Sequence, residues 1–541
     1  MTDTRPRERG LVTTPQLLER VDMVDVPDPQ PVSRPRAAVA GAIAAGVALG
    51  VGELGTALLD SGPSLVTAVG SEFVDRFAAS LKTLAVSLFG TNDKVALVTG
   101  IVITSVLFGA VIGLASRRRW LVAPVGFAMF GLVGAWALAS DPQGSTSRAI
   151  LAAAVSVAAG IGAFTLLARP VRPAGPAAAD DEPRPRRTTI DRRRFVIGAG
   201  GLAVTAGAAA VLGRRIRAAD SVETTRRSTV LPRPSRAATP PPTQPFEVDG
   251  LSPYVIPNAD FYRIDTALTT PQVDADRWKL RLTGLVDRPL ELDYEELLSL
   301  DSIEETVTIA CVSNEVGGRL VGNAVWQGVP LAALLERAGV QATATQIVGR
   351  SVDGFTAGFP VDVVDGRTAL VAYAMNGEPL PADHGYPARL IVAGLYGYVS
   401  ATKWLEEIEL TTWEAFDGYW VPRGWSKEGP IKTASRVDVP RSGARLVAGP
   451  QPIAGVAWAP SRGIDLVEVQ VDDGSWQRAE LGRVASGNTW VQWRLEWDAE
   501  PGEHIIRVRA TDGDGVTQTE ETAAPAPNGA SGWHSRQVRV T

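Results

Sequence analysis

The chain has 541 residues and a formal net charge of −6, so it is long enough for several domains and lacks the basic excess expected of a nucleic-acid-binding protein. Its single cysteine excludes intrachain disulfides, zinc ribbons and iron–sulfur clusters. Its 3 histidines all lie in the C-terminal half, so the apolar N-terminal half cannot ligate a haem through histidine, and no haem is expected in this chain.

The N-terminal part of the sequence predicts a multi-pass membrane anchor. Residues 1–36 are polar and proline-rich and predict a disordered cytoplasmic tail. Residues 37–215 predict an anchor of about five helices, since a span needs roughly 20 apolar residues. The first four spans are expected near 37–60, 94–115, 120–139 and 148–168. Arginines gather in alternate loops, such as 117–119, which places those loops in the cytoplasm. The amphipathic stretch 62–92 is expected to lie on the outer membrane interface.

A fifth apolar stretch, about 195–212, is preceded by a basic motif. The motif, Asp191-Arg192-Arg193-Arg194-Phe195, looks like a twin-arginine export signal. An ordinary basic flank of a membrane helix is the alternative. Beyond the helix, on the side where few arginines are expected, lie Arg214, Arg215 and Arg217. These arginines conflict with the tendency of positive loops to stay in the cytoplasm, and export of an already folded domain would override that tendency.

The remainder of the chain predicts a linker and two globular domains. Residues 216–249 are rich in Thr, Pro and Arg, which is typical of a linker. Residues 250–436 predict an α+β domain, with one short helix capped at Asp293 and another stopped at Gly339. Strands and turns over 437–541 predict an immunoglobulin-like β-sandwich.

Cys311 follows an alternating strand, 306–310, and opens a glycine-containing loop, 312–318. A buried core residue is the usual fate of such a cysteine. A soft thiolate also suits a transition metal, but one thiolate cannot hold a metal alone. If Cys311 is a ligand, a cofactor must therefore supply the other ligands.

Three segments in chain order carry a stronger signal. The first segment is Ile309-Ala310-Cys311-Val312-Ser313-Asn314-Glu315, followed by Gly322–Val329. The second is Asp383-His384-Gly385-Tyr386-Pro387-Ala388-Arg389. The third is the glycine-rich run Gly394–Trp404. They resemble the molybdenum-ligating and pterin-binding segments of the sulfite oxidase family. Glycines in the third segment would let backbone N–H groups approach a pterin phosphate. The resemblance covers roughly 250–541 and implies a molybdopterin-binding domain followed by a dimerisation domain.

The resemblance implies a molybdenum–molybdopterin cofactor with Cys311 as the metal ligand. The implied cofactor-binding residues are His384, Arg389, Ser400, Lys403 and Asn314. Two further residues are implied to be catalytic, namely Tyr419 as a donor to the metal-oxo or substrate oxygen and Arg263 as part of the pocket lining. The alternatives are an aromatic packing role for Tyr419 and a surface position for Arg263.

The resemblance further implies an extracytoplasmic enzyme, held in a bacterial cell membrane, that transfers an oxygen atom to or from a small substrate. Sulfite oxidases carry an arginine just after the ligand cysteine, where this chain has Asn314-Glu315-Val316, so a dianion site is weakened. An S-oxide reductase of the methionine sulfoxide type is therefore the close alternative. A non-catalytic displayed scaffold is another, whereas a transporter or quinone site is disfavoured because the spans lack charged residues of the kind that mark ion or proton paths. A separate electron-transfer partner and a homodimer are expected.

Overall fold

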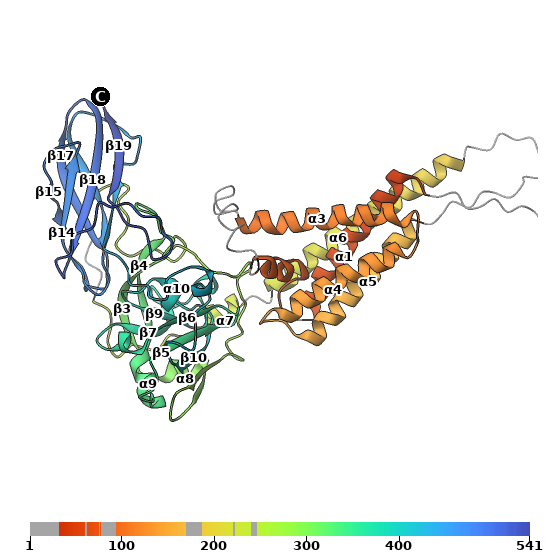
Figure 1. The fold of residues 1–541 in the computed structure, drawn as a ribbon, viewed down its shortest axis with the longest axis horizontal. Helices are drawn as coiled ribbons and strands as arrows, with labels where there is room; N and C mark the ends of the chain where they lie inside the picture. Colours follow the sequence, from red (N-terminus) through yellow and green to blue (C-terminus); the bar gives the residue numbers. More distant parts are fainter. Residues whose placement is uncertain are drawn as a thin grey trace, which may run out of the picture.

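The computed structural model describes residues 32–59, 62–74, 76, 93–168, 187–219, 222–239 and 246–541. It has three parts in chain order: a bundle of apolar helices, a sheet-rich domain and a further β-rich domain that carries the C-terminus (Figure 1). This order of parts confirms the predicted architecture. The predicted tail, 1–36, lies almost wholly outside the described residues.

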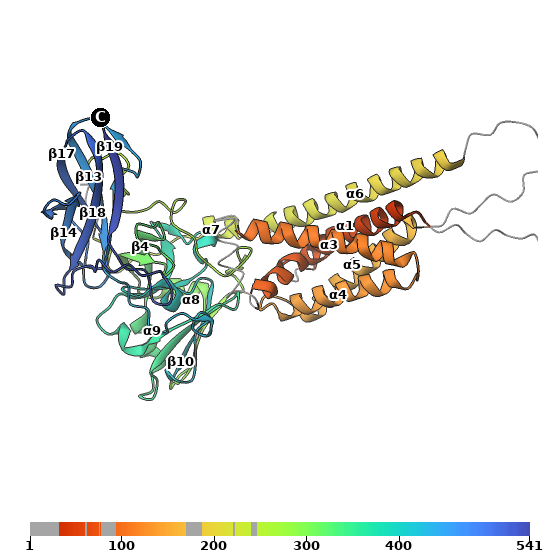
Figure 2. The same cartoon turned by 45° about the horizontal axis from the view of Figure 1, so that its top comes forward.

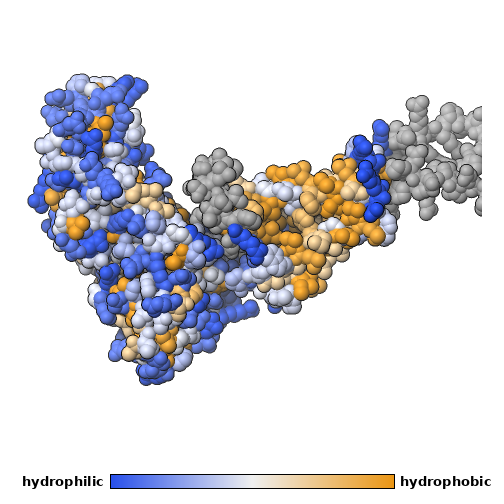
Figure 3. Space-filling view, viewed as in Figure 1, coloured by the Kyte–Doolittle hydropathy of each residue, from blue (hydrophilic) through white to orange (hydrophobic). Residues whose placement is uncertain are grey.

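The helical bundle contains five described helices that are long and apolar enough to cross a membrane. They are α1 (Arg34–Leu58), α3 (Asp93–Ser116), α4 (Val122–Ser140), α5 (Thr146–Leu167) and α6 (Arg187–Ala219). Apolar side chains cover the visible face of the bundle, as expected of a surface in contact with lipid (Figure 3). A polar band lies at the end of the bundle far from the sheet-rich domain.

Small residues allow the backbones of the bundle helices to touch. A Cβ atom added to Gly41 of α1 would lie 2.1 Å from the carbonyl oxygen of Gly109 in α3. One added to Gly50 of α1 would lie 2.3 Å from the carbonyl oxygen of Ala206 in α6. In lipid, which supplies no hydrophobic force between helices, close van der Waals contact of this kind would hold them together. The central helix is α1, which packs against α3, α5 and α6 (Figure 2).

The stretch 62–92, predicted to lie on the outer interface, is described in part. Its described residues form the short apolar helix Leu65–Val74. Leu65 and Ala68 of this helix pack against α4 and α5, while Gly70 faces Leu268 of the sheet-rich domain. The helix therefore lies where the bundle meets that domain.

The sheet-rich domain contains two sheets. One has the order β2-β1-β10-β5-β6 and the other β3-β4-β7-β8, with β9 paired to β7. The strands of the first sheet are β1 (Lys279–Gly284), β2 (Leu290–Asp293), β5 (Gln346–Ser351), β6 (Thr356–Pro360) and β10 (Leu405–Thr411). Those of the second are β3 (Ile303–Ala310), β4 (Val321–Pro330), β7 (Ala369–Met375), β8 (Glu378–Pro379) and β9 (Arg389–Val392). A shared core that includes Trp326, Tyr373 and Leu282 joins the sheets.

Short helices connect these strands and confirm two local predictions. They are α7 (Glu223–Ser228), α8 (Tyr294–Ser299), α9 (Leu331–Ala338), α10 (Gly397–Ser400) and the 3-10 turns η2 (Val361–Val364), η3 (Ala382–His384) and η4 (Val421–Arg423). Asp293 and Glu296 form a capping box on α8. Gly339 ends α9 with a left-handed φ of 70°, a conformation that glycine adopts without strain.

The expected linker, 216–249, is structured in part. Val222 joins the domain core, and the buried Arg226 pairs with Glu223 and donates to the carbonyl oxygen of Pro379, at 2.8 Å. Arg236 forms a β-bridge with Ile303 at the start of β3. These described residues are thus held against the domain by side-chain and backbone contacts.

The C-terminal domain consists of two sheets that enclose a common core. One sheet contains β11 (Ala434–Val439), β13 (Gly449–Trp458), β16 (Glu480–Leu481) and β17 (Val491–Ala499). The other contains β12 (Arg445–Leu446), β14 (Ile464–Val471), β15 (Gln477–Arg478), β18 (Gly502–Asp512) and β19 (His534–Val540). Their core is built from residues such as Val469, Trp493 and Ile506.

A loop of the C-terminal domain supports the strand that leads to Cys311. The backbone N–H of Thr308, in β3, donates to the carbonyl oxygen of Asn488 at 2.9 Å. The N–H of Trp490 donates to the Thr308 hydroxyl at 2.8 Å, and the Trp490 side chain belongs to the core of the sheet-rich domain. The two domains therefore fix the end of β3 together.

Candidate active site

A cavity of about 110 Å³ gathers four of the predicted site residues: Cys311, His384, Arg389 and Lys403. Cys311 follows the last residue of β3, His384 ends η3, Arg389 begins β9, and Lys403 lies between α10 and β10. The end of β3 and the stretch 384–403, which are distant in sequence, thus converge on one cavity. All four side chains are buried.

The loop after Cys311 is closed by its own hydrogen bonds. The Cys311 N–H donates to the carbonyl oxygen of Leu320 at 2.9 Å, and the Asn314 N–H donates to that of Cys311 at 3.0 Å. The Asn314 side-chain oxygen accepts from the Leu320 N–H at 2.8 Å. Asn314 and Glu315 line a different cavity, toward the C-terminal domain. The structure therefore shows Asn314 shaping the loop and does not bring its side chain to the cavity of Cys311.

Arg389 is a buried cation that the protein satisfies only in part. One of its terminal nitrogens donates to the carbonyl oxygen of His384 at 3.0 Å, and its guanidinium lies 5.1 Å from the centre of the Trp326 ring. Its Nε has no hydrogen-bond partner among the described residues. Burial lowers the pKa of Arg389 to about 10. A desolvated cation with an unused donor fits an anionic group in the cavity.

His384 is neutral at physiological pH. Burial lowers its pKa to about 4, and the charge of Arg389 acts in the same direction. Nε2 lies 3.0 Å from the carbonyl oxygen of Asn258, which can only accept, so Nε2 carries the proton. Nδ1 is consequently an acceptor, able to receive a hydrogen bond from an N–H group of a cofactor.

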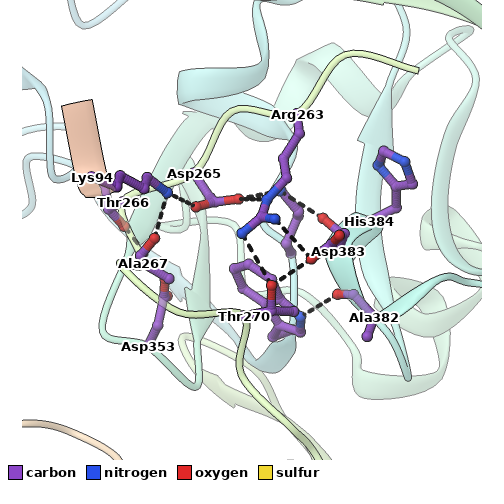
Figure 4. Close-up of polar contacts among 12 residues, drawn as sticks. Lys94, Arg263, Asp265, Thr266, Ala267, Thr270, Asp353, Ala382, Asp383 and His384 are labelled. Carbon is purple, nitrogen blue, oxygen red and sulfur yellow. Dashed lines mark hydrogen bonds and ion pairs between the residues drawn. The ribbon is translucent and has the colours of Figure 1, made fainter. Parts of the chain in front are cut away.

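A network of polar contacts surrounds Asp265 (Figure 4), and it includes Lys403. Lys403 Nζ donates to Asp265 Oδ2 at 3.0 Å and to the carbonyl oxygen of Asp383 at 2.9 Å. Arg263 Nε donates to the same Oδ2 at 3.1 Å, and its Nη1 lies 3.0 Å from Asp383 Oδ1. Burial lowers the pKa of Lys403 to about 8, although Asp265 opposes that shift. Burial alone would raise the pKa of Asp265, but Lys403 and Lys94 hold it well below its usual range.

Three other predicted residues lie beside the cavity and not in its lining. Arg263 is exposed and braces Asp265. Ser400 is buried, and its hydroxyl donates to the carbonyl oxygen of Tyr396 at 3.1 Å. The Tyr419 ring lies 5.8 Å from that of Phe355 and faces a neighbouring cavity at the bundle. The structure thus gives Arg263 and Ser400 local structural contacts and places Tyr419 among aromatic side chains.

Aromatic residues that sequence reasoning missed form much of the cavity wall. They are Phe261, Tyr262, Phe355, Tyr398, Trp404, Trp420 and Trp425. Burial and the negative charge of Cys311 raise the pKa of Tyr262, and burial raises that of Tyr398 to about 12. Both phenols therefore stay protonated at neutral pH. The tryptophan-rich run 420–425 was the sequence signal that could have indicated this wall.

The donor set fits a metal that arrives with its own cofactor. Among the described parts of the chain, no group of three His, Cys, Asp or Glu side chains is close enough to hold a metal ion. A single thiolate needs further ligands from elsewhere. The buried cations Arg389 and Lys403 and the acceptor nitrogen of His384 supply complementary contacts for an anionic, N–H-bearing molecule.

Comparison with known proteins agrees with this chemistry. The family model "Oxidoreductase molybdopterin binding domain" matches residues 267–420. The chain is 37% identical over 156 residues to the uncharacterized oxidoreductase YuiH of Bacillus subtilis (strain 168), a match that spans 29% of this chain and 76% of that relative. It is 28% identical over 341 residues to the mitochondrial sulfite oxidase of Macaca fascicularis, spanning 53% of this chain and 62% of that protein. It is 33% identical over 179 residues to the NADH nitrate reductase of Solanum lycopersicum, spanning 28% and 19%.

Proposed function

Because the chain belongs to the sulfite oxidase family of molybdopterin-dependent oxidoreductases, we propose that it is a membrane-anchored extracytoplasmic enzyme that transfers an oxygen atom to or from a small substrate. The observation that carries this proposal is the single cavity in which Cys311 meets His384, Arg389 and Lys403. The cofactor of this family is a molybdenum–molybdopterin. When bound, it supplies a two-electron redox centre that the protein side chains cannot provide.

The chain's own residues would bind and orient that cofactor. Cys311 would provide the protein thiolate ligand at the mouth of its closed loop. Arg389, through its unused Nε, and Lys403 would hold the anionic phosphate. His384 would accept an N–H group of the pterin at Nδ1, since Nε2 is engaged by Asn258. Asn314 and Ser400 would act indirectly, by shaping the loops on which these side chains stand.

The wall of the cavity favours a neutral sulfur substrate over a dianion. The cations in its described lining are Arg389 and Lys403, and Lys403 is already paired with Asp265. Sulfite would need an additional positive charge near Cys311, and the described lining of this cavity offers no third cation. The rings of Trp420 and Trp425 instead offer an apolar surface. S-oxide reduction consumes two electrons and two protons and releases a sulfide and water. The lining thus supports this reaction as a candidate beside sulfite oxidation.

The arrangement of charge along the bundle supports an extracytoplasmic position for the sheet-rich domain, which is the catalytic domain of this proposal. Arg117, Arg118 and Arg119 join α3 to α4 at the end of the bundle far from the sheet-rich domain (Figure 1). Positive loops favour the cytoplasm, so the catalytic domain would face the opposite side. The motif at Arg192–Phe195 would then serve as a signal for export of the folded domain. Electrons would come from or go to a separate partner protein, and the C-terminal domain would mediate a homodimer.

A pair of assays on the full-length chain, purified from a host that makes the cofactor, tests the reaction. One measures sulfite-dependent reduction of a dye, and the other measures S-oxide-dependent oxidation of a reduced dye. We expect turnover with S-oxides to exceed turnover with sulfite by about tenfold or more, the discrimination expected of a site without the extra cation. Turnover with sulfite alone would assign the oxidative reaction, and turnover with neither would favour the displayed scaffold.

A further inference from the structure

The membrane bundle reaches into the charge network of the catalytic domain through one side chain. Lys94, in the first turn of α3, donates to Asp265 Oδ1 at 2.7 Å and to the carbonyl oxygen of Ala267 at 2.5 Å (Figure 4). Asp265 is 171 residues away in sequence. Its side chain is 3% exposed, whereas that of Lys94 is 34% exposed. The ion pair is therefore largely shielded from water on the carboxylate side, where charge–charge interactions are strongest.

The carboxylate that Lys94 contacts is shared with the cofactor cavity. Asp265 Oδ1 accepts from Lys94, whereas Oδ2 accepts from Lys403 and Arg263. Lys403 and Asp265 both line the cavity of Cys311. Three cations thus share one buried carboxylate. The orientation of this carboxylate determines how strongly it pairs with Lys403.

Two further close contacts hold the bundle against the catalytic domain. Pro142, after α4, lies 2.7 Å from the position of a Cβ atom on Gly354, and Leu268 lies 2.8 Å from that of a Cβ atom on Gly70. A cavity at this junction is lined by Glu72 of the bundle and Asp353 of the catalytic domain, among others. It shares Thr266, Asp353 and Phe355 with the cavity of Cys311. The bundle therefore borders the active-site region directly.

We propose that Lys94 is a positioning residue for the cofactor site: it holds Asp265 Oδ1 and thereby sets the orientation of the carboxylate that holds Lys403. Without Lys94, fewer cations neutralise the negative charge of Asp265, so its ion pair with Lys403 becomes stronger. Lys403 then offers less positive charge to an anion in the cavity. The bundle would consequently help to retain the cofactor as well as anchor the enzyme. This inference rests on the proposed role of Lys403 in binding the cofactor phosphate.

The test measures how fast molybdenum and pterin leave the purified full-length holoenzyme after dilution. In Lys94→Met we expect release to be about five times faster than in the wild type, because a partly exposed ion pair contributes a free energy of about that size. Lys94→Arg should restore retention because it keeps the charge and the donors. Arg76→Met is the matched control, since Arg76 is a bundle cation whose ion pair, with Glu72, stays within the bundle. Its release rate should equal that of the wild type.

A double-mutant cycle separates this inference from the proposed function. Lys403→Met should release the cofactor faster, and adding Lys94→Met to it should have no further effect. If Lys403→Met releases the cofactor no faster than the wild type, the proposed role of Lys403 fails. If Lys403→Met is fast but Lys94→Met behaves like Arg76→Met, or if the two effects simply add, the inference about Lys94 is overturned. Lys94→Gln takes the place of Lys94→Met if the latter does not fold.

Discussion

In the bundle of apolar helices, α1 meets α3 and α6 at Gly41 and Gly50 with the backbones in contact, whereas the catalytic domain fills its interior with large side chains such as Trp326 and Tyr373. The bundle core is built mostly from alanine and glycine, which carry no functional groups. The catalytic core leaves a cavity, walled largely by aromatic rings, in which Arg389 is buried.

This difference assigns assembly of the bundle to the helix interfaces and cofactor binding to the cavity of the catalytic domain. A helix interface made of backbone contacts tolerates almost no added volume, so substitutions there should disturb assembly of the bundle. Substitutions in the cavity should remove contacts to the cofactor and leave the fold intact. Lys94 is the exception, because it belongs to the bundle by sequence and to the cavity network by contact. The following predictions test this division.

The largest effect is expected from Gly41→Leu. The added side chain would meet the carbonyl oxygen of Gly109, 2.1 Å from the Cβ position, and α1 would separate from α3. We expect a cost of about 3 kcal/mol or more, seen as loss of the monodisperse chain after extraction from the membrane. Gly46→Leu is the control, because no atom in the described part of the chain lies within 4 Å of its Cβ position. Equal yields of the two variants would refute the packing account.

Arg389→Met should weaken cofactor binding without unfolding the domain. The change removes a buried cation whose Nε is unused by the described residues and whose guanidinium lies over the Trp326 ring, and it leaves an unbranched apolar side chain in its place. We expect pterin affinity to fall by about 100-fold, as for loss of a buried charged contact, with an unchanged thermal midpoint of the apoprotein. Full pterin retention in this variant would remove Arg389 from the site.

Acid should destabilise the C-terminal domain through His534. Burial lowers its pKa to about 4, and Nδ1 accepts the N–H of Val437 at 3.0 Å. Below the unfolded-state pKa of about 6.5, the unfolded chain binds a proton that the folded chain refuses, so stability falls as pH falls from 7 toward 4. The loss should be about 1–2 kcal/mol by pH 5. In His534→Asn, which keeps an acceptor, the melting temperature should depend less on pH; an unchanged pH dependence would exclude His534.

The smallest effects should distinguish two neighbouring aromatic residues. Trp420 lines the cavity of Cys311, whereas Tyr419 faces the junction with the bundle. Trp420→Ala should raise the KM for the substrate by about tenfold, because it removes apolar surface next to the reacting group. Tyr419→Phe should change kcat by less than about twofold, since no proton donor would be lost from the cavity. A large fall in kcat in Tyr419→Phe would restore it as the catalytic donor.

The sequence motifs located the central residues of the site but not their surroundings. Cys311, His384, Arg389 and Lys403, which the structure brings to one cavity, could be named from the sequence because each lies in a contiguous string that resembles a segment of the family. Asn314 was predicted to bind the cofactor, yet it lines a different cavity, because a local string does not reveal which face of a loop a side chain occupies. The capped helix at Asp293 was predictable because its hydrogen bonds are local.

Long-range contacts were beyond the reach of the sequence. The Lys94–Asp265 pair joins residues far apart in the chain, and nothing in either segment indicates the other. The loop that carries Asn488 and supports β3 likewise comes from the next domain. Such contacts depend on how whole elements pack against each other, which composition and periodicity do not specify.

The most direct test of the account is the molybdenum and pterin content of the full-length chain beside that of Cys311→Ser, with X-ray absorption at the molybdenum edge. We expect roughly one molybdenum and one pterin per wild-type chain, and one fewer sulfur ligand, or loss of the metal, in the variant. A wild-type chain without molybdenum, isolated from a host that makes the cofactor, or an identical metal spectrum in Cys311→Ser, would contradict the central claim that Cys311 is the metal ligand.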